Sequence, residues 1–343
     1  MLKRIILSPI DLLLLFWGWV IYMVTGSTTK RTYNSMVRLF CITKGYSSEI
    51  IHSMVTLFRR PYLLKHDLSG AMGTFNQQDI RKITEQLNTD GYYIFENRLQ
   101  SETVDRLVKF AQETDAFARP YRSDGSAVVE RTKMRFDSEH PETIRYDWHA
   151  TQLLQNEDVQ KLISDEVLLA ISQEYLGCAP IVDGVRMWWN TTFSKDPNPE
   201  AATMYHFDME RLKWFKVFVY LTDVSEENGP HAFIKGTHKV GALPYDLLKK
   251  GYVMSSDEEI YNYFDKNEEI LYTAPRGTMI IEDTKGLHKG TPVKSGDRLI
   301  LQMQFSDCMF GMDSDASFPT NKTKELTDAI NKYPKVYEYY NRD

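Results

Sequence analysis

The sequence contains few cysteines. Its 343 residues include three, and Cys41, Cys178 and Cys308 lie far apart. A disulfide framework needs several paired cysteines, and a cysteine-based zinc site needs them closely spaced, so both are excluded. So low a cysteine content is typical of a protein from a reducing compartment, and we expect a cytoplasmic location.

The chain also lacks an excess of basic charge. Its 41 Lys and Arg are outnumbered by 47 Asp and Glu, which gives a net charge of -6. A surface that binds nucleic acid has to be basic, because most of its affinity comes from contacts with phosphate groups. No nucleic-acid partner is therefore expected.

No stretch is apolar over the roughly 20 residues that a membrane-spanning helix needs. Residues 5–24 come nearest, but Pro9 and Asp11 interrupt them. The uninterrupted part is only about 13 residues long. This segment fits a short membrane anchor, a re-entrant or interfacial helix, a helix buried against the protein, or a cleaved signal peptide.

The segments after residue 24 are amphipathic and basic up to about residue 65. Repeated helices of this kind are typical of a membrane-surface module, although a helical subdomain that packs on the protein itself has the same pattern. More basic residues follow the apolar run than precede it, which favours a cytoplasmic main domain that is associated with the membrane through residues 5–24.

The polar stretch at residues 66–74 is expected to be a linker. The domain boundaries predicted on this basis are an N-terminal helical region at 1–70, a main domain at 71–318 and a C-terminal tail or helix at 319–343.

Beyond the linker, the pattern alternates between a few helices and many short strands. Helical periodicity is found at residues 76–87, 101–114 and 158–176. Runs rich in Val, Ile and aromatic residues predict strands at 91–95, 180–189, 214–221, 232–234 and 270–283. These strands do not alternate regularly with helices, which excludes a doubly wound parallel sheet. We expect a mainly β fold with flanking helices, a double-stranded β-helix (jelly roll, cupin-like), preceded by the N-terminal helical region.

The stretch from Met204 to Glu210 places two metal-binding residue types close together. If this stretch is extended, side chains two positions apart leave the same face of the strand. His206 and Asp208 then point together while Phe207 points the other way. An imidazole and a carboxylate in this arrangement supply two of the ligands of a metal site.

A third ligand has to come from a distant strand, and His288, within residues 284–292, is the candidate. Two histidines and one carboxylate on one side of a metal form the facial triad of non-haem Fe(II) oxygenases, which leaves three coordination positions open. Ten residues after His288, Arg298 stands at the head of an apolar run. Its guanidinium is suitably placed to bind a carboxylate through two hydrogen bonds.

These residues, with the element Asn-Gly-Pro-His-Ala-Phe-Ile-Lys-Gly-Thr-His-Lys at 228–239, resemble the phytanoyl-CoA dioxygenase (PhyH) family of Fe(II)/2-oxoglutarate oxygenases. The resemblance covers roughly residues 77–310. In that family the 228–239 element shapes the barrel, so its histidines, His231 and His238, are not expected to bind the metal.

The resemblance implies a role for each site residue. His206, Asp208 and His288 are expected to hold Fe(II), Arg298 to pair with the 5-carboxylate of 2-oxoglutarate, and Asn190 to face the co-substrate. O2 is the other co-substrate that the family uses. The implied reaction hydroxylates an unactivated C–H bond and converts 2-oxoglutarate to succinate and CO2. Because a carboxylate is present at position 208, hydroxylation is favoured over halogenation.

The substrate class is open between a small molecule and a lipid-like compound, because one family acts on many substrates. Two other classes of function compete with the oxygenase. One is a non-catalytic jelly-roll binding protein at a membrane, and the other is a cupin-type metalloenzyme that does not use 2-oxoglutarate. The oligomeric state does not follow from the sequence.

Overall fold

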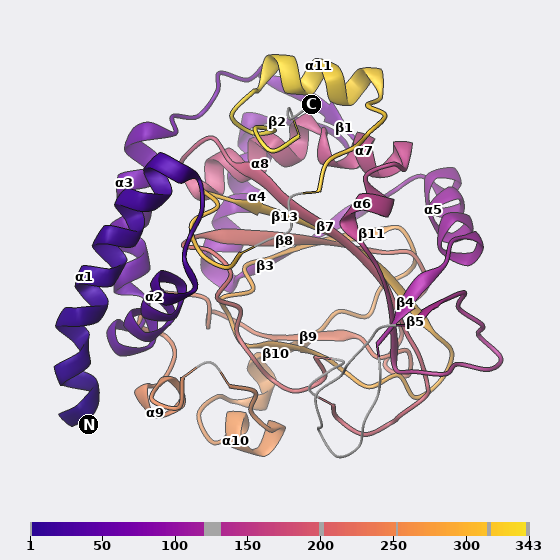
Figure 1. Ribbon diagram of the computed structural model, residues 1–343. Helices are drawn as coiled ribbons and strands as arrows, with labels where there is room; N and C mark the ends of the chain where they lie inside the picture. The colour runs from indigo at the N-terminus through magenta and orange to yellow at the C-terminus, as the bar shows by residue number, and fades with distance from the viewer. Residues whose placement is uncertain (1, 120–131, 199–201, 252, 314–316, 341–343) are drawn as a thin grey trace.

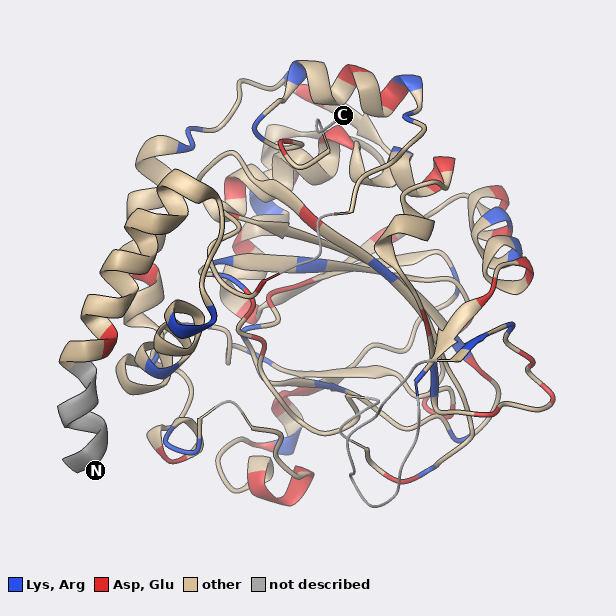
Figure 2. Cartoon of the chain, in the orientation of Figure 1, with Lys and Arg blue, Asp and Glu red and all other residues tan. Residues whose placement is uncertain are grey.

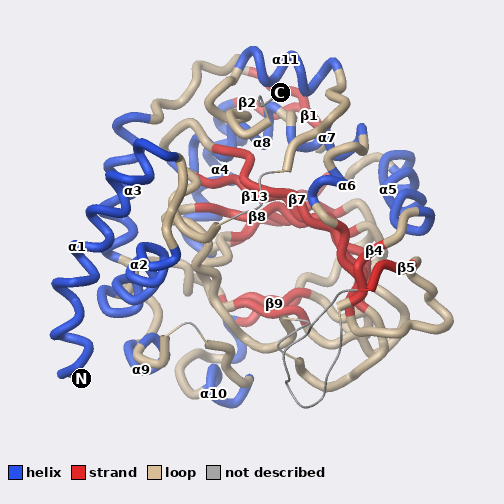
Figure 3. The backbone as a smooth tube through the Cα atoms, viewed as in Figure 1, coloured by secondary structure: helices blue, strands red, loops and turns tan. Residues whose placement is uncertain are grey.

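The computed structural model describes residues 2–119, 132–198, 202–251, 253–313 and 317–340, and the side chains from residue 9 onward (Figure 1). A large antiparallel sheet faces a smaller one across the centre of the molecule, and helices cover the outer side of the large sheet (Figures 1 and 3). Three further helices, at the N-terminus, lie against one side of the barrel. This is the double-stranded β-helix with flanking helices that the strand pattern predicted.

The large sheet has eight strands, and in spatial order they are β3 (Tyr92–Arg98), β11 (Thr278–Glu282), β8 (Trp214–Tyr220), β13 (Arg298–Ser306), β7 (Ile181–Asn190), β6 (Arg145–Trp148), β4 (Ala116–Ala118) and β5 (Thr132–Met134). The small sheet consists of β10 (Glu269–Leu271), β9 (His231–Ile234) and β12 (His288–Gly290). All the pairings are antiparallel, so neighbouring strands present alternate side chains to the two faces of their sheet.

Strand β13 shows how this alternation separates the core from the site. Leu299, Leu301 and Met303 belong to the apolar core beneath the helices, whereas Ile300 lies in a cluster between the two sheets. Side chains an even number of positions away from Ile300 point to the same face of the strand. Arg298 is therefore directed into the barrel, as the sequence suggested.

The helices on the large sheet are α4 (Gln77–Asp90), α5 (Ser101–Glu113), α6 (Ala150–Leu153), α7 (Glu157–Ile163), α8 (Glu166–Leu176) and α11 (Lys324–Lys332). The single helix predicted at 158–176 was wrong, because the chain breaks between Ile163 and Glu166. At the break, Asp165 is the N-cap of α8 and accepts hydrogen bonds from the N–H groups of Val167 and Leu168. The same carboxylate also accepts a bond from the N–H of Ala71.

Replacing Asp165 with alanine is expected to lower the free energy of unfolding by about 2 kcal/mol, because three N–H groups lose one acceptor. Urea denaturation monitored by circular dichroism measures the change. The matched control is Asp67→Ala, whose carboxylate is exposed, and it should shift the midpoint little. Equal effects of the two substitutions would contradict the capping role.

The segment expected to be a linker is ordered instead. Residues 66–74 mostly form a hairpin of β1 (Asp67–Gly70) and β2 (Gly73–Asn76), and this hairpin packs against α8. Its polar side chains predicted a loop, but Leu68 and Met72 are buried in the apolar core and hold the hairpin against it. Residues 241–267 contain two short helices, α9 (Tyr245–Leu248) and α10 (Asp257–Tyr261).

The N-terminal helices are α1 (Leu2–Thr25), α2 (Lys30–Thr43) and α3 (Tyr46–Phe58). Pro9 lies inside α1 and does not end it. Leu15, Leu39 and Val55, one from each helix, join a cluster with Phe207 of the predicted metal motif. Within the ranges that the structure describes, no helix is both long enough and apolar enough to cross a membrane.

Candidate metal centre

His206 and His288 form a cross-strand pair at the edge of the small sheet. The N–H of each donates to the carbonyl of the other, at 3.0 and 2.9 Å. Side chains of directly opposed residues leave the same face of a sheet. The two imidazole rings therefore lie together inside the barrel, with 4.3 Å between their centroids.

Asp208 completes the group, although the predicted strand around it is absent. Only Tyr205 and His206 make isolated bridges there. Asp208 is anchored instead through its N–H, which donates to the carbonyl of Thr284. Its two carboxylate oxygens lie 3.9 Å from Nε2 of His206 and 3.5 Å from Nε2 of His288. The three residues are close enough to hold one metal ion.

Backbone carbonyl groups determine which nitrogen of each ring carries the proton. Nδ1 of His206 donates to the carbonyl of Met204, and Nδ1 of His288 donates to that of Gly286, each at 2.9 Å. With the proton on Nδ1, the lone pair of each ring is on Nε2, the nitrogen that faces Asp208. Burial and the neighbouring His206 lower the pKa of His288 to about 3, so this ring is neutral and able to bind a metal at neutral pH.

Lys216 of β8 is a buried cation within the site. Its Nζ donates to Oδ2 of Asp208 at 2.6 Å and lies 3.1 Å from Oε2 of Glu210. Burial raises the pKa of Asp208, but the nearby charges of Lys216 and the histidines outweigh burial and lower it overall. Since Oδ2 is occupied by Lys216, Oδ1 is the oxygen of Asp208 that remains free for a metal.

Arg298 occupies the first position of β13, opposite Asn190 at the end of β7. Its Nη2 donates to Oδ1 of Asn190 at 2.8 Å, and the same oxygen accepts a bond from the indole of Trp188. Nε and Nη1 of Arg298 are buried and have no hydrogen-bond partner among the described residues. A guanidinium with two buried, unsatisfied N–H donors is costly unless an anion binds there. The residues present thus fit a dicarboxylate between Arg298 and the metal group.

A second group of potential ligands lies beside the first. His231, Glu282 and His288 are also close enough to hold a metal. However, Nε2 of His231 already pairs with Oε1 of Glu282 at 3.1 Å. Burial and the charge of Arg298 lower the pKa of His231, so its ring is neutral. His238 lies elsewhere and contacts the carbonyl of Asn88.

Sequence reasoning missed three charged residues of the site: Lys216, Glu282 and Glu210. A signal was present for the first two. Each is the one charged side chain in a strand that is otherwise apolar or weakly polar, Trp214–Tyr220 and Thr278–Glu282 respectively. Burying a charge is costly, so a charged residue at an inward position of a core strand indicates either a partner or a function.

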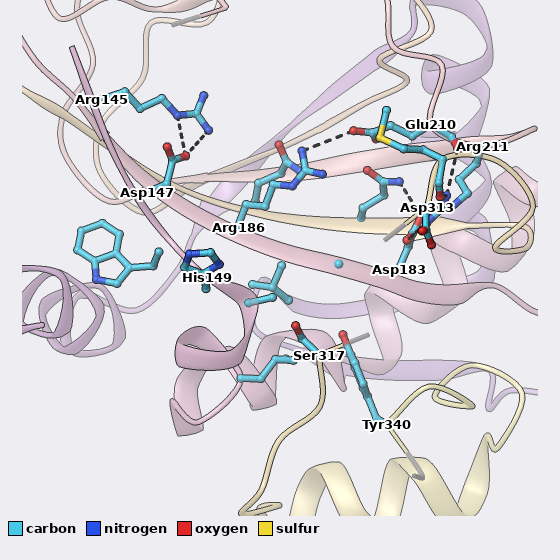
Figure 4. A pocket seen from close by; sticks show the side chains of 18 of the residues that line it. Arg145, Asp147, His149, Asp183, Arg186, Glu210, Arg211, Asp313, Ser317 and Tyr340 are labelled. Atoms are coloured by element: carbon cyan, nitrogen blue, oxygen red, sulfur yellow. Dashed lines mark hydrogen bonds and ion pairs between the residues drawn. The ribbon is translucent and has the colours of Figure 1, made fainter. Parts of the chain in front are cut away.

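A cavity of about 430 Å³ lies beside strands β6 and β7 (Figure 4). Glu210 lines it and connects it to Asp208 through Lys216. Charged side chains from several strands point into the cavity, among them Arg145 and Asp147 of β6 and Arg186 of β7.

The walls of this cavity contain several ion pairs. Arg145 and Arg119 both donate to the carboxylate of Asp147, and Arg145 also lies 4.2 Å above the ring of Trp188. Burial lowers the pKa of Arg145 to about 9 despite the attraction of Asp147. On the far wall Arg211 forms a buried ion pair with Asp183 at 2.7 Å. The cavity is therefore strongly polar.

Comparison with solved structures finds oxygenases of low sequence identity. HygX from Streptomyces hygroscopicus, solved with nickel and 2-oxoglutarate, is 14% identical over 72% of this chain and 93% of its own, with a TM-score of 0.49. EctD from S. alaskensis, solved with Fe, is 16% identical over 75% of this chain and 88% of its own, with a TM-score of 0.45. No curated protein sequence matches the chain.

Comparison with family models gives a match over most of the barrel. The model described as Phytanoyl-CoA dioxygenase (PhyH) matches residues 87–299, which include the two histidines, the aspartate and Arg298. This match confirms the resemblance seen in the sequence, and it covers more than half of the chain. Fe(II), 2-oxoglutarate and O2 are the cofactor and co-substrates of the enzymes in this family. The chain therefore belongs to the phytanoyl-CoA dioxygenase family and is a 2-oxoglutarate-dependent non-haem iron oxygenase.

Proposed function

We propose that His206, Asp208 and His288 hold Fe(II), and that Arg298 binds the 5-carboxylate of 2-oxoglutarate. The observation that carries the assignment is the pair of unsatisfied donors on Arg298, in the same barrel as a group with metal-ligand geometry. Asn190 acts through Arg298, because its side-chain oxygen holds Nη2 and so orients the guanidinium toward the co-substrate.

The proposed reaction is the hydroxylation of an unactivated C–H bond. With Fe(II) bound, 2-oxoglutarate and O2 give succinate and CO2, and the second oxygen atom enters the substrate as a hydroxyl group. The chain's own residues orient the reactants and exclude water. Lys216 keeps Asp208 in place through Oδ2, and the presence of this carboxylate favours hydroxylation over halogenation.

We further propose that the substrate is a small, polar molecule with an anionic group. The cavity that Glu210 and Lys216 connect to Asp208 is lined by arginine and carboxylate side chains, and a lipid chain would remove their contact with water without offering a hydrogen bond. The side chain of Arg186 is 55% exposed and its ion pair with Glu210 is long, at 3.5 Å, so its guanidinium is free to bind a carboxylate or phosphate.

The test of the reaction is an anaerobic titration of the full chain with Fe(II) and then 2-oxoglutarate. The metal-to-ligand charge-transfer band in the visible spectrum is expected when both bind at one ferrous site. Succinate release in air is then measured with a panel of amino-acid derivatives, sugar phosphates and acyl-CoA thioesters. Stimulation by acyl-CoA thioesters alone would contradict the polar substrate, and no band would contradict the site.

Arg186→Gln is expected to raise KM for the best anionic compound of that panel about tenfold, because one charge-assisted hydrogen bond is lost. Basal release of succinate without substrate should stay unchanged, since Arg186 touches neither the metal group nor Arg298. The matched control is Arg276→Gln, at an exposed arginine that pairs with Asp105 outside the cavity. An equal rise in KM for both variants would show that Arg186 has no specific role.

A further inference from the structure

Helix α1 exposes a broad apolar face to solvent. Leu13, Phe16 and Trp17 are each 60% exposed, although such residues are normally buried in a protein free in water. A continuous apolar surface of this extent is typical of a contact with a partner or a membrane. The exposed apolar residues of α1, called here the α1 apolar face, are Ile10, Leu12, Leu13, Phe16, Trp17, Val20, Ile21, Met23 and Val24.

The polar group of α1 is on the opposite side. Asp11 is buried, and its carboxylate accepts hydrogen bonds from Ser35 at 2.9 Å and from Nε of Arg38 at 3.1 Å. Leu15 on the same side packs into the cluster shared with α2 and α3. The acidic side chain of α1 is thus neutralised within the protein, and the α1 apolar face carries no charge (Figure 2).

Charge is unevenly distributed along the chain. Residues 1–65 contain nine Lys and Arg but two Asp and Glu, a net charge of +7, whereas the whole chain has a net charge of -6. The acids are Asp11 and Glu49, and both have basic partners, Arg38 and Lys285 respectively. Exposed basic residues follow α1 and α3, at Lys30, Arg31, Arg60 and Lys65.

We propose that the N-terminal helices bind the surface of an anionic lipid bilayer, with α1 lying in the interface and its apolar face among the acyl chains. The uncharged face suits the hydrocarbon, and the exposed basic residues that follow α1 and α3 suit anionic headgroups. A second copy of the chain fits less well, because two helical regions of charge +7 repel each other and neither has an unpaired acid for the other's lysines. Helix α3 also has exposed apolar residues, namely Tyr46, Ile50, Met54, Leu57 and Phe58.

This surface is physically connected to the cavity. The hydroxyl group of Tyr22 accepts a bond from the N–H of Met309, and Trp19 packs edge-on against Phe310 with 5.2 Å between the centroids. Two residues further on, Met312 lines the cavity. The helix that meets the bilayer therefore also supports one rim of the cavity.

The test is co-sedimentation of the full chain with vesicles of phosphatidylcholine, with and without phosphatidylserine. Wild-type protein should bind the anionic vesicles, and Leu13→Glu/Trp17→Glu should bind them at least about tenfold more weakly. The matched control is Tyr263→Glu/Phe318→Glu, two aromatic residues that are 42% and 38% exposed far from α1 in the sequence, and it should bind like wild type. Lys30→Gln/Arg31→Gln should weaken binding to anionic vesicles by about tenfold and leave binding to neutral ones unchanged.

Iron and 2-oxoglutarate binding are measured on every variant. A loss of vesicle binding can therefore be distinguished from a failure of the proposed function. Wild-type protein that does not sediment with either vesicle overturns the proposal. Sedimentation velocity tests for self-association of the wild-type protein. If wild-type protein binds no vesicles but self-associates, and Leu13→Glu/Trp17→Glu abolishes this association, then a second copy of the chain covers the α1 apolar face.

Discussion

Asp208→Ala is expected to lower 2-oxoglutarate turnover by about a thousandfold or more and to abolish the visible charge-transfer band. The substitution removes one of three ligands. It also leaves the buried ammonium of Lys216 next to the two histidines with only Glu210 as a partner. A metal dication then meets the ammonium of Lys216 where it had the carboxylate of Asp208.

The same substitution is expected to destabilise the fold by about 3 kcal/mol, since breaking a buried ion pair leaves a charge without its partner. Asp208→Ala/Lys216→Met should recover most of this stability but none of the turnover. The control is Asp246→Ala, at a carboxylate that is exposed on α9. Turnover that survives in Asp208→Ala would show that the metal is held elsewhere, for example by His231 and Glu282 with His288.

Arg298→Leu is expected to raise KM for 2-oxoglutarate about a hundredfold, because a buried, bidentate hydrogen-bonded ion pair is lost. Fe(II) affinity measured without 2-oxoglutarate should change less than about twofold, since Arg298 is not a metal ligand. Arg298→Lys should recover little, because an ammonium cannot reproduce the planar pair of donors.

Asn190→Ala tests whether Asn190 acts through Arg298. It should raise KM for 2-oxoglutarate by about tenfold, the effect of losing one hydrogen bond that orients the guanidinium. Combined with Arg298→Leu it should add almost nothing, because its effect depends on the arginine. Full additivity of the two substitutions would mean that Asn190 contacts the co-substrate directly.

The relative placement of some proposed site residues was predictable because it follows from local spacing. His206 and Asp208 are two positions apart, and the structure places them on one side of the chain even though the regular strand is missing. Arg298 was expected at the head of an apolar run, and β13 begins there. In each case two or three neighbouring residues determine the direction of the side chain.

Lys216, Glu282 and the pairing of Asn190 with Arg298 were not predictable in this way. They depend on which strands are neighbours: β8 and β7 flank β13, and β11 lies next to β8. The break at Asp165 differs, because its N-cap bonds to Val167 and Leu168 are local and its bond to Ala71 alone depends on a distant segment. Contacts between residues about a hundred positions apart leave no periodic trace in the sequence.

The sequence by itself determined the fold class, the family and the residue types of the metal group, because hydrophobic periodicity and motif spacing are local properties of the chain. Tertiary structure decided the rest: which oxygen of Asp208 is free, which donors of Arg298 are unpaired, and which face of α1 is exposed. Each of these depends on packing between distant segments. The free energy of a buried charge or an exposed apolar side chain is set by its neighbours in space.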